Sequence, residues 1–183
     1  DWSSDVCSSD LFLHEFKPIL GRLRVGHGGA PVKSARGHSS TGAPRATPRR
    51  VQALLRAYQL DDGGRIRIEK IGCQAAHARF RIGRRHLRPG DTVSGPTLMA
   101  LADVAMYAAL LGEIGLVPLA VTTHLSINFL RKPAPKDVLA HARLLKVGQR
   151  LAVGEVTLYS DGDNAPVAHV TSTYSIPPHH SRA

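Results

Sequence analysis

The stretch that decides the fold is residues 97–112, which read TLMALADVAMYAALLG. Apolar side chains follow one another almost without interruption here, so a helix formed by them has no polar face. A helix that is apolar all round is buried on nearly every side. Gly112 and the sequence Gly-Leu-Val-Pro at 115–118 end it, because glycine and proline stop helices. The stretch therefore predicts a central helix that the rest of the domain wraps.

One charged residue, Asp103, interrupts this apolar helix. An unpaired carboxylate among apolar side chains is unfavourable unless it is neutralised or paired. No lysine or arginine stands three or four positions away, where the sequence has Met99, Ala100, Met106 and Tyr107. A chemical role is the simplest explanation for such a carboxylate. The alternatives are a structural anchor held by threonine or backbone groups, and a carboxylate that faces a solvent channel.

Segments that alternate apolar and polar residues surround the helix and predict strands. In chain order we expect a short helix at 51–60, strands at 65–71 and 76–82, a loop at 84–94, the central helix, and strands at 120–130, 137–147, 151–159 and 166–176. Strands joined by turn-length links form an antiparallel sheet. The predicted fold class is α+β, a curved antiparallel sheet of about five to six strands wrapped around one helix, with a sheet edge that favours pairing with a second copy.

The two ends of the chain are expected to lie outside this domain. Residues 1–11, DWSSDVCSSDL, resemble the translation of a sequencing-adapter oligonucleotide and are interpreted as an artefact. Residues 12–50 are rich in Gly, Pro, Ser, Arg and His without helical or strand periodicity. Such a segment is predicted to be disordered or to be upstream sequence read from a wrong gene start. The folded domain is accordingly placed at 51–178, and residues 179–183 are read as a tail.

Composition narrows the classes of partner. The formal charge is +10, and residues 51–183 keep 16 basic and 10 acidic residues, so the domain itself is basic. A basic surface suits a polyanion, either nucleic acid or the phosphates of coenzyme A, although general solubility explains it equally well. No nucleic-acid-binding motif supports the first partner. Cys7 and Cys73 lack the spacing of a zinc site or a disulfide framework, so no metal is expected. The apolar stretch is too short to span a bilayer, and a cytoplasmic protein that contacts neither membrane nor nucleic acid is expected.

Several motifs carry a resemblance to a known family. They are HLRPGDTVSGP at 86–96, MALAD at 99–103, SINFLRKP at 126–133 and GQRLA at 148–152. In order and spacing they resemble the PaaI-type (phenylacetate pathway) branch of the hotdog-fold acyl-CoA thioesterases, over roughly residues 60–178. The resemblance implies a hotdog fold, a homodimer or homotetramer, and hydrolysis of an acyl-CoA thioester with no cofactor beyond the coenzyme A of the substrate.

The resemblance also implies roles for three residues. Gly95 corresponds to the glycine whose N–H binds the thioester carbonyl, and Asp103 to the general base or nucleophile. Thr122 corresponds to a position that helps to place the attacking water. Where the family has His-Gly-Gly, however, this chain has Ser94-Gly95-Pro96, and Arg88 stands where many members have asparagine. These departures bear on how the carbonyl is bound.

Further residues are candidates for support of the site or for binding of coenzyme A. Ser94 is expected to cap the central helix, which is also its purely structural interpretation. The candidate supporting residues are Ser94, His86, Arg88 and His124, of which His124 shares one predicted strand face with Thr122. The candidate coenzyme A-binding residues are Arg131, Lys132, Gly148 and Arg150. For the basic residues, a solvated positive surface is the alternative interpretation.

Rival functions stay open at this level. A hotdog hydratase or dehydratase needs a histidine paired with its carboxylate, and the helix offers none close after Asp103. A non-catalytic acyl-CoA-binding protein is the other alternative, in which the Ser-Gly-Pro sequence has made the site inert. Neither the acyl group nor the choice between dimer and tetramer follows from the sequence.

Overall fold

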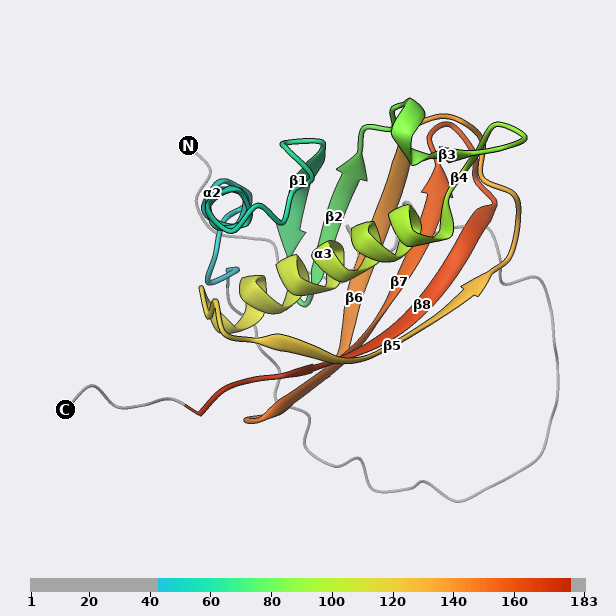
Figure 1. The fold of residues 1–183 in the computed structure, drawn as a ribbon. Coiled ribbons are helices and arrows are strands. Elements are labelled where there is room, and N and C mark those ends of the chain that lie inside the picture. Colours follow the sequence, from blue (N-terminus) through green and yellow to red (C-terminus); the bar gives the residue numbers. More distant parts are fainter. Residues whose placement is uncertain (1–42, 179–183) are drawn as a thin grey trace, which may run out of the picture. The chain divides into compact units, whose positions relative to one another are not determined.

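The computed structural model describes residues 43–178, and the predicted apolar helix lies at their centre. This helix, α3, spans Gly95–Ile114, two residues further at each end than the pattern indicated. Ser94 is its N-cap, and Gly115 ends it with a φ of 91°, a conformation that glycine adopts without a Cβ clash. Figure 1 shows α3 lying across the strands of a curved sheet.

Six strands form this sheet, in the order β1-β2-β6-β7-β8-β5, and every neighbouring pair is antiparallel. The strands are β1 (Ile66–Gly72), β2 (Ala75–Phe80), β5 (Val121–Phe129), β6 (Val138–Val147), β7 (Leu151–Ser160) and β8 (Pro166–Ser175). The predicted hotdog fold, an antiparallel sheet around one long apolar helix, is confirmed. The segment predicted as a loop at 84–94 is more ordered, with a 3-10 turn at Arg84–His86 and a small hairpin of β3 (Leu87–Arg88) and β4 (Thr92–Val93).

Close packing against the sheet explains why α3 has no polar face. From Leu101 to Gly112 every residue of the helix except Asp103 is buried. Two glycines permit the closest approaches. A Cβ added at Gly154 of β7 would lie 2.6 Å from the Met106 sulfur, and one added at Gly112 would lie 2.5 Å from Ile71. Larger residues at these two positions would overpack the core.

By length and composition alone, α3 could cross a membrane. The helix has 20 residues and a mean hydropathy of 1.5, enough to cross a bilayer, so the expectation that the stretch is too short was wrong. In the fold, 67% of the most apolar segment of this helix is buried. The sheet thus provides the apolar surroundings that the composition of the helix requires.

The compact unit begins earlier than the predicted boundary at residue 51. It starts at Pro44, and the first helix, α2, spans Pro48–Ala57 with Thr47 as its N-cap. Ala46 is fully buried, and the Arg45 N–H donates to the Gly112 carbonyl at 2.7 Å, so this segment is tied to the end of α3. A threonine cap followed by proline is a helix start signal within a stretch whose composition otherwise indicates disorder. The predictions for residues 1–42 and 179–183 fall outside the described residues.

The last strand in the sheet order, β5, departs from simple alternation. The sequence predicted one apolar and one polar face, yet no residue of β5 is buried, and only Leu125 and Ile127 are half-buried. Because β5 pairs with β8 alone, its other edge faces away from the sheet. Val121 and Phe129 are 56% and 55% exposed. This edge carries the residues that approach Asp103.

Candidate active site

The N-terminus of α3 presents a single free backbone donor. The first N–H groups of any α-helix lack partners within the helix. Here the Ser94 side chain accepts from the Thr97 N–H at 3.4 Å, Leu98 N–H donates to the Ser94 carbonyl, and Pro96 has no N–H. Within residues 43–178, the Gly95 N–H has no acceptor. This N–H, at the positive end of the helix dipole, suits an oxygen that carries or develops negative charge.

An apolar wall stands beside this donor. A Cβ added at Gly95 would lie 3.1 Å from Cζ of Phe129, the last residue of β5. One turn further along α3, Met99 is 40% exposed. The absence of a side chain at Gly95 therefore keeps a narrow approach to the N–H open between α3 and Phe129.

Two hydroxyl groups hold the half-buried Asp103 carboxylate. The Thr122 hydroxyl, from β5, donates to Asp103 Oδ1 at 2.6 Å. The Tyr174 hydroxyl, from β8, lies 2.7 Å from the same oxygen and 3.0 Å from the backbone carbonyl of Asp103. The structure thus brings Thr122 and Asp103, both candidate catalytic residues, into direct contact. The helix contributes no cation to the carboxylate, as its sequence indicated.

Tyr174 is a contact of Asp103 that was not predicted from the sequence. A tyrosine in an alternating strand is ordinarily a core residue, and this one is 2% exposed. Burial, followed by the neighbouring Asp103 charge, raises the pKa of its phenol far above the usual value. The phenol therefore stays protonated and available as a donor. The only signal in the sequence was that two hydroxyl side chains, Ser172 and Tyr174, stand on the row of β8 that otherwise faces the apolar helix.

A β-bulge in β5 turns Thr122 towards Asp103. Thr122 pairs with Tyr174, but the next pair is His124 with Thr173, so the register skips Thr123. Bulges re-aim side chains in this way. Thr122 consequently lies on the helix side with Tyr174, whereas His124 lies on the opposite side of the strand. The prediction that Thr122 and His124 share one face was wrong, because simple alternation does not anticipate the extra residue.

Gly95 and Asp103 are separated along α3. They stand eight residues apart, and at 1.5 Å of rise per residue the two positions differ by about 12 Å along the helix axis. A hydrogen-bond donor and a base each act within about 3 Å of the atoms they serve. One copy of the chain therefore does not bring both groups to the same carbonyl.

His86 supports the fold around the start of α3 and makes no contact with the carboxylate. Its Nδ1 accepts from the Gly83 N–H at 2.9 Å, and its Nε2 lies 3.0 Å from Arg85 Nε and 3.1 Å from Asp62 Oδ2. The side chain is buried, and its backbone carbonyl accepts from Ser94. Neither ring nitrogen reaches Asp103 or the Gly95 N–H. A buried ring with both nitrogens engaged favours the structural interpretation of this histidine.

The basic candidates fall into two groups at opposite ends of α3. Lys132 lies beside the Gly90 turn of the β3–β4 hairpin, which leads directly into the helix, and Arg131 donates to the Pro166 carbonyl at 2.9 Å. Arg88, in β3 of the same hairpin, is exposed. Gly148 and Arg150, in contrast, lie in the β6–β7 turn, where Gly148 lines a hollow together with Glu113 and Ile114. The structure does not bring the four predicted coenzyme A ligands together within one chain.

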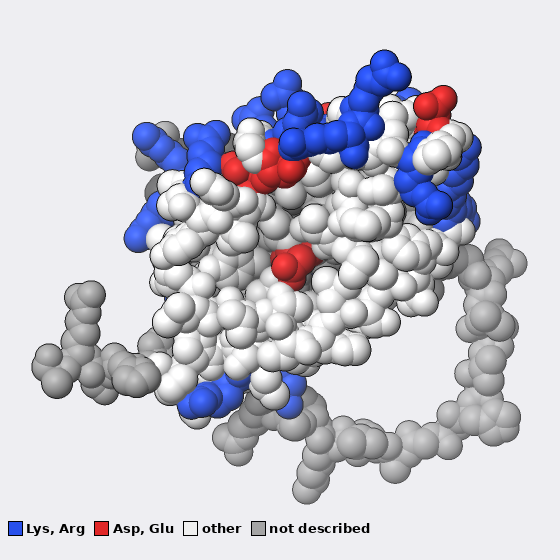
Figure 2. Space-filling model, in the orientation of Figure 1, with Lys and Arg blue, Asp and Glu red and all other residues white. Residues whose placement is uncertain are grey.

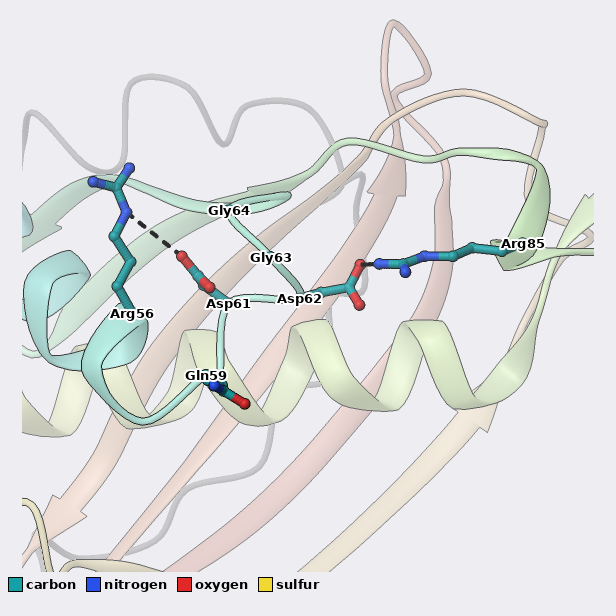
Figure 3. A pocket seen from close by; sticks show the side chains of 7 residues that line it. All are labelled: Arg56, Gln59, Asp61, Asp62, Gly63, Gly64 and Arg85. Atoms are coloured by element: carbon teal, nitrogen blue, oxygen red, sulfur yellow. Dashed lines mark hydrogen bonds and ion pairs between the residues drawn. The ribbon is translucent and has the colours of Figure 1, made fainter.

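One face of the molecule separates an acidic side chain from the basic ones. Figure 2 shows a single acidic side chain in a hollow whose surroundings are uncharged, while lysine and arginine, with a few acidic side chains among them, lie along the margins. A separate open hollow, shown in Figure 3, is lined by Arg56, Asp61, Asp62 and Arg85 among others. Its arginines are already engaged, Arg56 with Asp61 and Arg85 with Asp62. Across residues 43–178, no cluster of three His, Cys, Asp or Glu side chains is arranged to hold a metal ion.

Known proteins share the family pattern and the fold of this chain. The family model of the thioesterase superfamily matches residues 90–167, which include Gly95, Asp103 and Thr122. No curated protein matches the chain significantly. Among solved structures, a protein from Silicibacter sp. TM1040, provisionally named a thioesterase, is 46% identical to this chain. The match covers 72% of this chain and 92% of that protein, with a TM-score of 0.66.

More distant structures share the fold. A thioesterase from Haemophilus influenzae is 20% identical, with 76% and 99% of the two chains covered and a TM-score of 0.65. A mutant of the phenylacetic acid degradation protein PaaI from Thermus thermophilus is 23% identical, with 65% and 99% covered and a TM-score of 0.57. At such identities the likeness concerns the fold alone. With the family match and the 46% identical structure, the chain belongs to the thioesterase superfamily.

Proposed function

We propose that the protein is an acyl-CoA thioesterase of the PaaI type, which hydrolyses a small or medium acyl- or aryl-CoA. One observation carries the proposal: the Asp103 carboxylate, on an apolar helix, is held by two hydroxyl donors and has no cation partner among the described residues. A group so placed suits general-base catalysis or nucleophilic attack. The family match and the solved structure that is 46% identical support the same reaction class.

The chemistry assigns one task to each group. Asp103 takes a proton from a water molecule as the water oxygen attacks the thioester carbonyl carbon. The negative charge that develops on the carbonyl oxygen is stabilised by the Gly95 N–H and the helix dipole. The tetrahedral intermediate then collapses and the carbon–sulfur bond breaks. The proton on Asp103 passes to the departing thiolate, so that a carboxylic acid and coenzyme A leave the site.

The separation of Gly95 and Asp103 implies that a second copy completes the site. If two chains pack with α3 antiparallel near the open β5 edge, the Gly95 N–H of one chain faces the Asp103 carboxylate of the other. Phe129 and Met99 then line the acyl group, and a wall of apolar residues favours an uncharged acyl chain or ring. We propose a homodimer as the smallest active unit.

Basic residues near the start of α3 are placed to bind the phosphates of coenzyme A. Arg131 and Lys132 are exposed at that end of the helix, and exposed Arg88 lies in the adjacent hairpin. Guanidinium and ammonium groups bind phosphate through charge-assisted hydrogen bonds. Gly148 and Arg150, at the other end of α3, join this set only if the second copy brings its β6–β7 turn to the same ligand.

The test of the proposal is hydrolysis of a panel of acyl-CoAs by the full chain, followed through thiol release. We expect turnover of at least one thioester, and Asp103→Asn is expected to lose about 100-fold or more in kcat. The matched control is Asp163→Asn, the same change at an exposed position in the β7–β8 turn, which leaves the rate unchanged. If no thioester is hydrolysed while acyl-CoAs still raise the melting temperature, the protein is a binder and the proposal fails.

The role of the Gly95 N–H has its own test. Ser94 has φ −71° and ψ 149°, an extended conformation that a following proline accepts, so Gly95→Pro removes the N–H at a helix position suited to proline. Gly95→Ala keeps the N–H and adds the Cβ that meets Phe129. We expect Gly95→Pro to lose about 100-fold in kcat, as for other oxyanion donors, and Gly95→Ala to lose less. Equal losses would mean that the space at Gly95 matters and the donor does not.

A further inference from the structure

We propose that Tyr174 is a positioning residue for Asp103: with Thr122 it occupies Oδ1 and leaves Oδ2 as the oxygen that reacts. This inference rests on the proposed function, because it concerns how the same carboxylate is oriented. Two hydroxyls from two different strands, β5 and β8, meet one carboxylate oxygen from α3 at 2.6 and 2.7 Å. Three elements far apart in the sequence thus converge on a single atom.

The two oxygens of the carboxylate have different surroundings. Oδ1 accepts from both Thr122 and Tyr174, whereas no donor among residues 43–178 lies on Oδ2. A carboxylate oxygen has two lone pairs in the plane of the group, so two short hydrogen bonds use the acceptor capacity of Oδ1. Oδ2 keeps both of its lone pairs. The oxygen able to take a proton from water is therefore Oδ2.

Tyr174 is the more rigid of the two donors. Its ring is 2% exposed and stacks on Tyr107 of α3, with centroids 6.0 Å apart and planes inclined by 12°. Thr122, by contrast, is an exposed residue on the edge strand. A buried ring has little freedom to move away, whereas an exposed hydroxyl exchanges readily with water. The orientation of the carboxylate consequently depends on Tyr174 more than on Thr122.

A fixed carboxylate matters because a base acts within hydrogen-bond reach of the proton it removes. Without the phenol, the carboxylate is free to rotate about its χ2 torsion, which is broad for aspartate. It then spends less time with a free oxygen directed at the attacking water. Loss of the Tyr174 hydroxyl should therefore lower kcat while the binding of acyl-CoA, and with it KM, stays nearly constant.

The experiment compares two tyrosine-to-phenylalanine variants that each remove one hydrogen-bonded hydroxyl. Tyr107 is the matched control: it stacks on Tyr174, is also buried, and donates to the Pro118 carbonyl at 3.2 Å. We expect Tyr174→Phe to lower kcat about 10- to 100-fold, as for a lost hydrogen bond to a charged group. Tyr107→Phe should leave kcat within about twofold of wild type, while the melting temperatures of the two variants are similar.

A second readout separates positioning from a general structural defect. Added to Asp103→Asn, Tyr174→Phe should lower the residual rate by less than about twofold, because residues that act as one unit are not additive. A structural defect would lower that residual rate as much as it lowers the wild-type rate, and would overturn the proposal. So would a Tyr174→Phe variant with full kcat beside an inactive Asp103→Asn, in which case the thioesterase function stands. A wild type that hydrolyses no thioester would overturn both the thioesterase function and the role of Tyr174.

Discussion

One edge of the sheet is covered by a side chain of α2, and the other edge is exposed. At β1, Gln52 of α2 covers the edge: its amide oxygen accepts from the Ile68 N–H at 2.9 Å, and its amide nitrogen donates to the Ile66 carbonyl at 3.0 Å. At β5 no described segment covers the outer edge, and apolar side chains at both ends of the strand are exposed. Proteins usually protect sheet edges, so an edge left open beside the candidate site indicates a surface for pairing.

The β1 edge serves the stability of the fold, whereas the β5 edge serves the candidate site. The closed β1 edge satisfies backbone groups within one chain and contributes no residue near Asp103. The open β5 edge contributes Thr122 and Phe129, and its bulge aims Thr122 at the carboxylate. We therefore expect changes at β5 to alter activity through assembly, and changes at β1 to alter the free energy of unfolding without altering the chemistry.

The largest expected effect comes from blocking the open edge. Val121→Lys together with Ser126→Lys adds two positive charges to the edge strand of each copy, and repulsion between like charges on two β5 strands opposes their pairing. We expect the variant to become monomeric in light scattering and to lose about 100-fold or more of its thioesterase activity, since a displaced partner misplaces the reacting groups.

The control for this variant carries the same added charge at the closed edge, as Ala53→Lys with Ala57→Lys on the exposed side of α2. It should keep both the oligomeric state and the rate. A monomeric wild type with full activity would refute the pairing, and with it the composite site.

The next prediction concerns whether each active site contains residues from two chains. Gly95→Pro and Asp103→Asn should each be nearly inactive alone. When the two chains are mixed under conditions that let subunits exchange, half of the dimers are mixed and each has one intact site, so we expect about a quarter of wild-type activity. The measurement is thiol release before and after exchange. Activity no greater than the sum of the two parents would place both groups in a single chain.

The smallest effect on activity is expected at the closed edge. Gln52→Ala leaves the Ile68 N–H and the Ile66 carbonyl without their partners, and we expect a loss of about 2–4 kcal/mol in the free energy of unfolding. Urea denaturation measures this loss, and kcat per folded molecule should not change. Gln59→Ala, at an exposed position just after α2, is the control and should alter stability little. A fall in kcat for Gln52→Ala would mean that the two edges are coupled.

The fold was predictable because its main signals are local. An apolar helix with no polar face and strands with period-two patterns identify their own elements, and the observed bounds lie within a few residues of those expected. The start of the domain was missed because the Thr47-Pro48 cap signal lies in a segment whose composition indicates disorder. The small β3–β4 hairpin was missed because two-residue strands carry no periodicity.

The candidate site was only partly predictable because its contacts are not local. Asp103 is conspicuous in the sequence, but its partner Tyr174 lies 71 residues further along the chain and has the sequence character of a core residue. The bulge that orients Thr122 depends on pairing with β8, and strand alternation alone assigned Thr122 to the face of His124, away from the helix. His86 has two acceptable interpretations in sequence, and its contacts with Gly83, Arg85 and Asp62 favour the structural one.

The order of elements along the chain has a consequence during synthesis. The apolar helix α3 is complete at residue 114, while the strands β6, β7 and β8 that bury it end only at residue 175. A ribosome adding about 5–20 residues per second needs several seconds to make them. Throughout that interval a helix apolar enough to cross a bilayer has only the β1–β2 hairpin and α2 to cover it. Nascent chains of this protein are therefore expected to depend on chaperones that shield apolar helices until translation is finished.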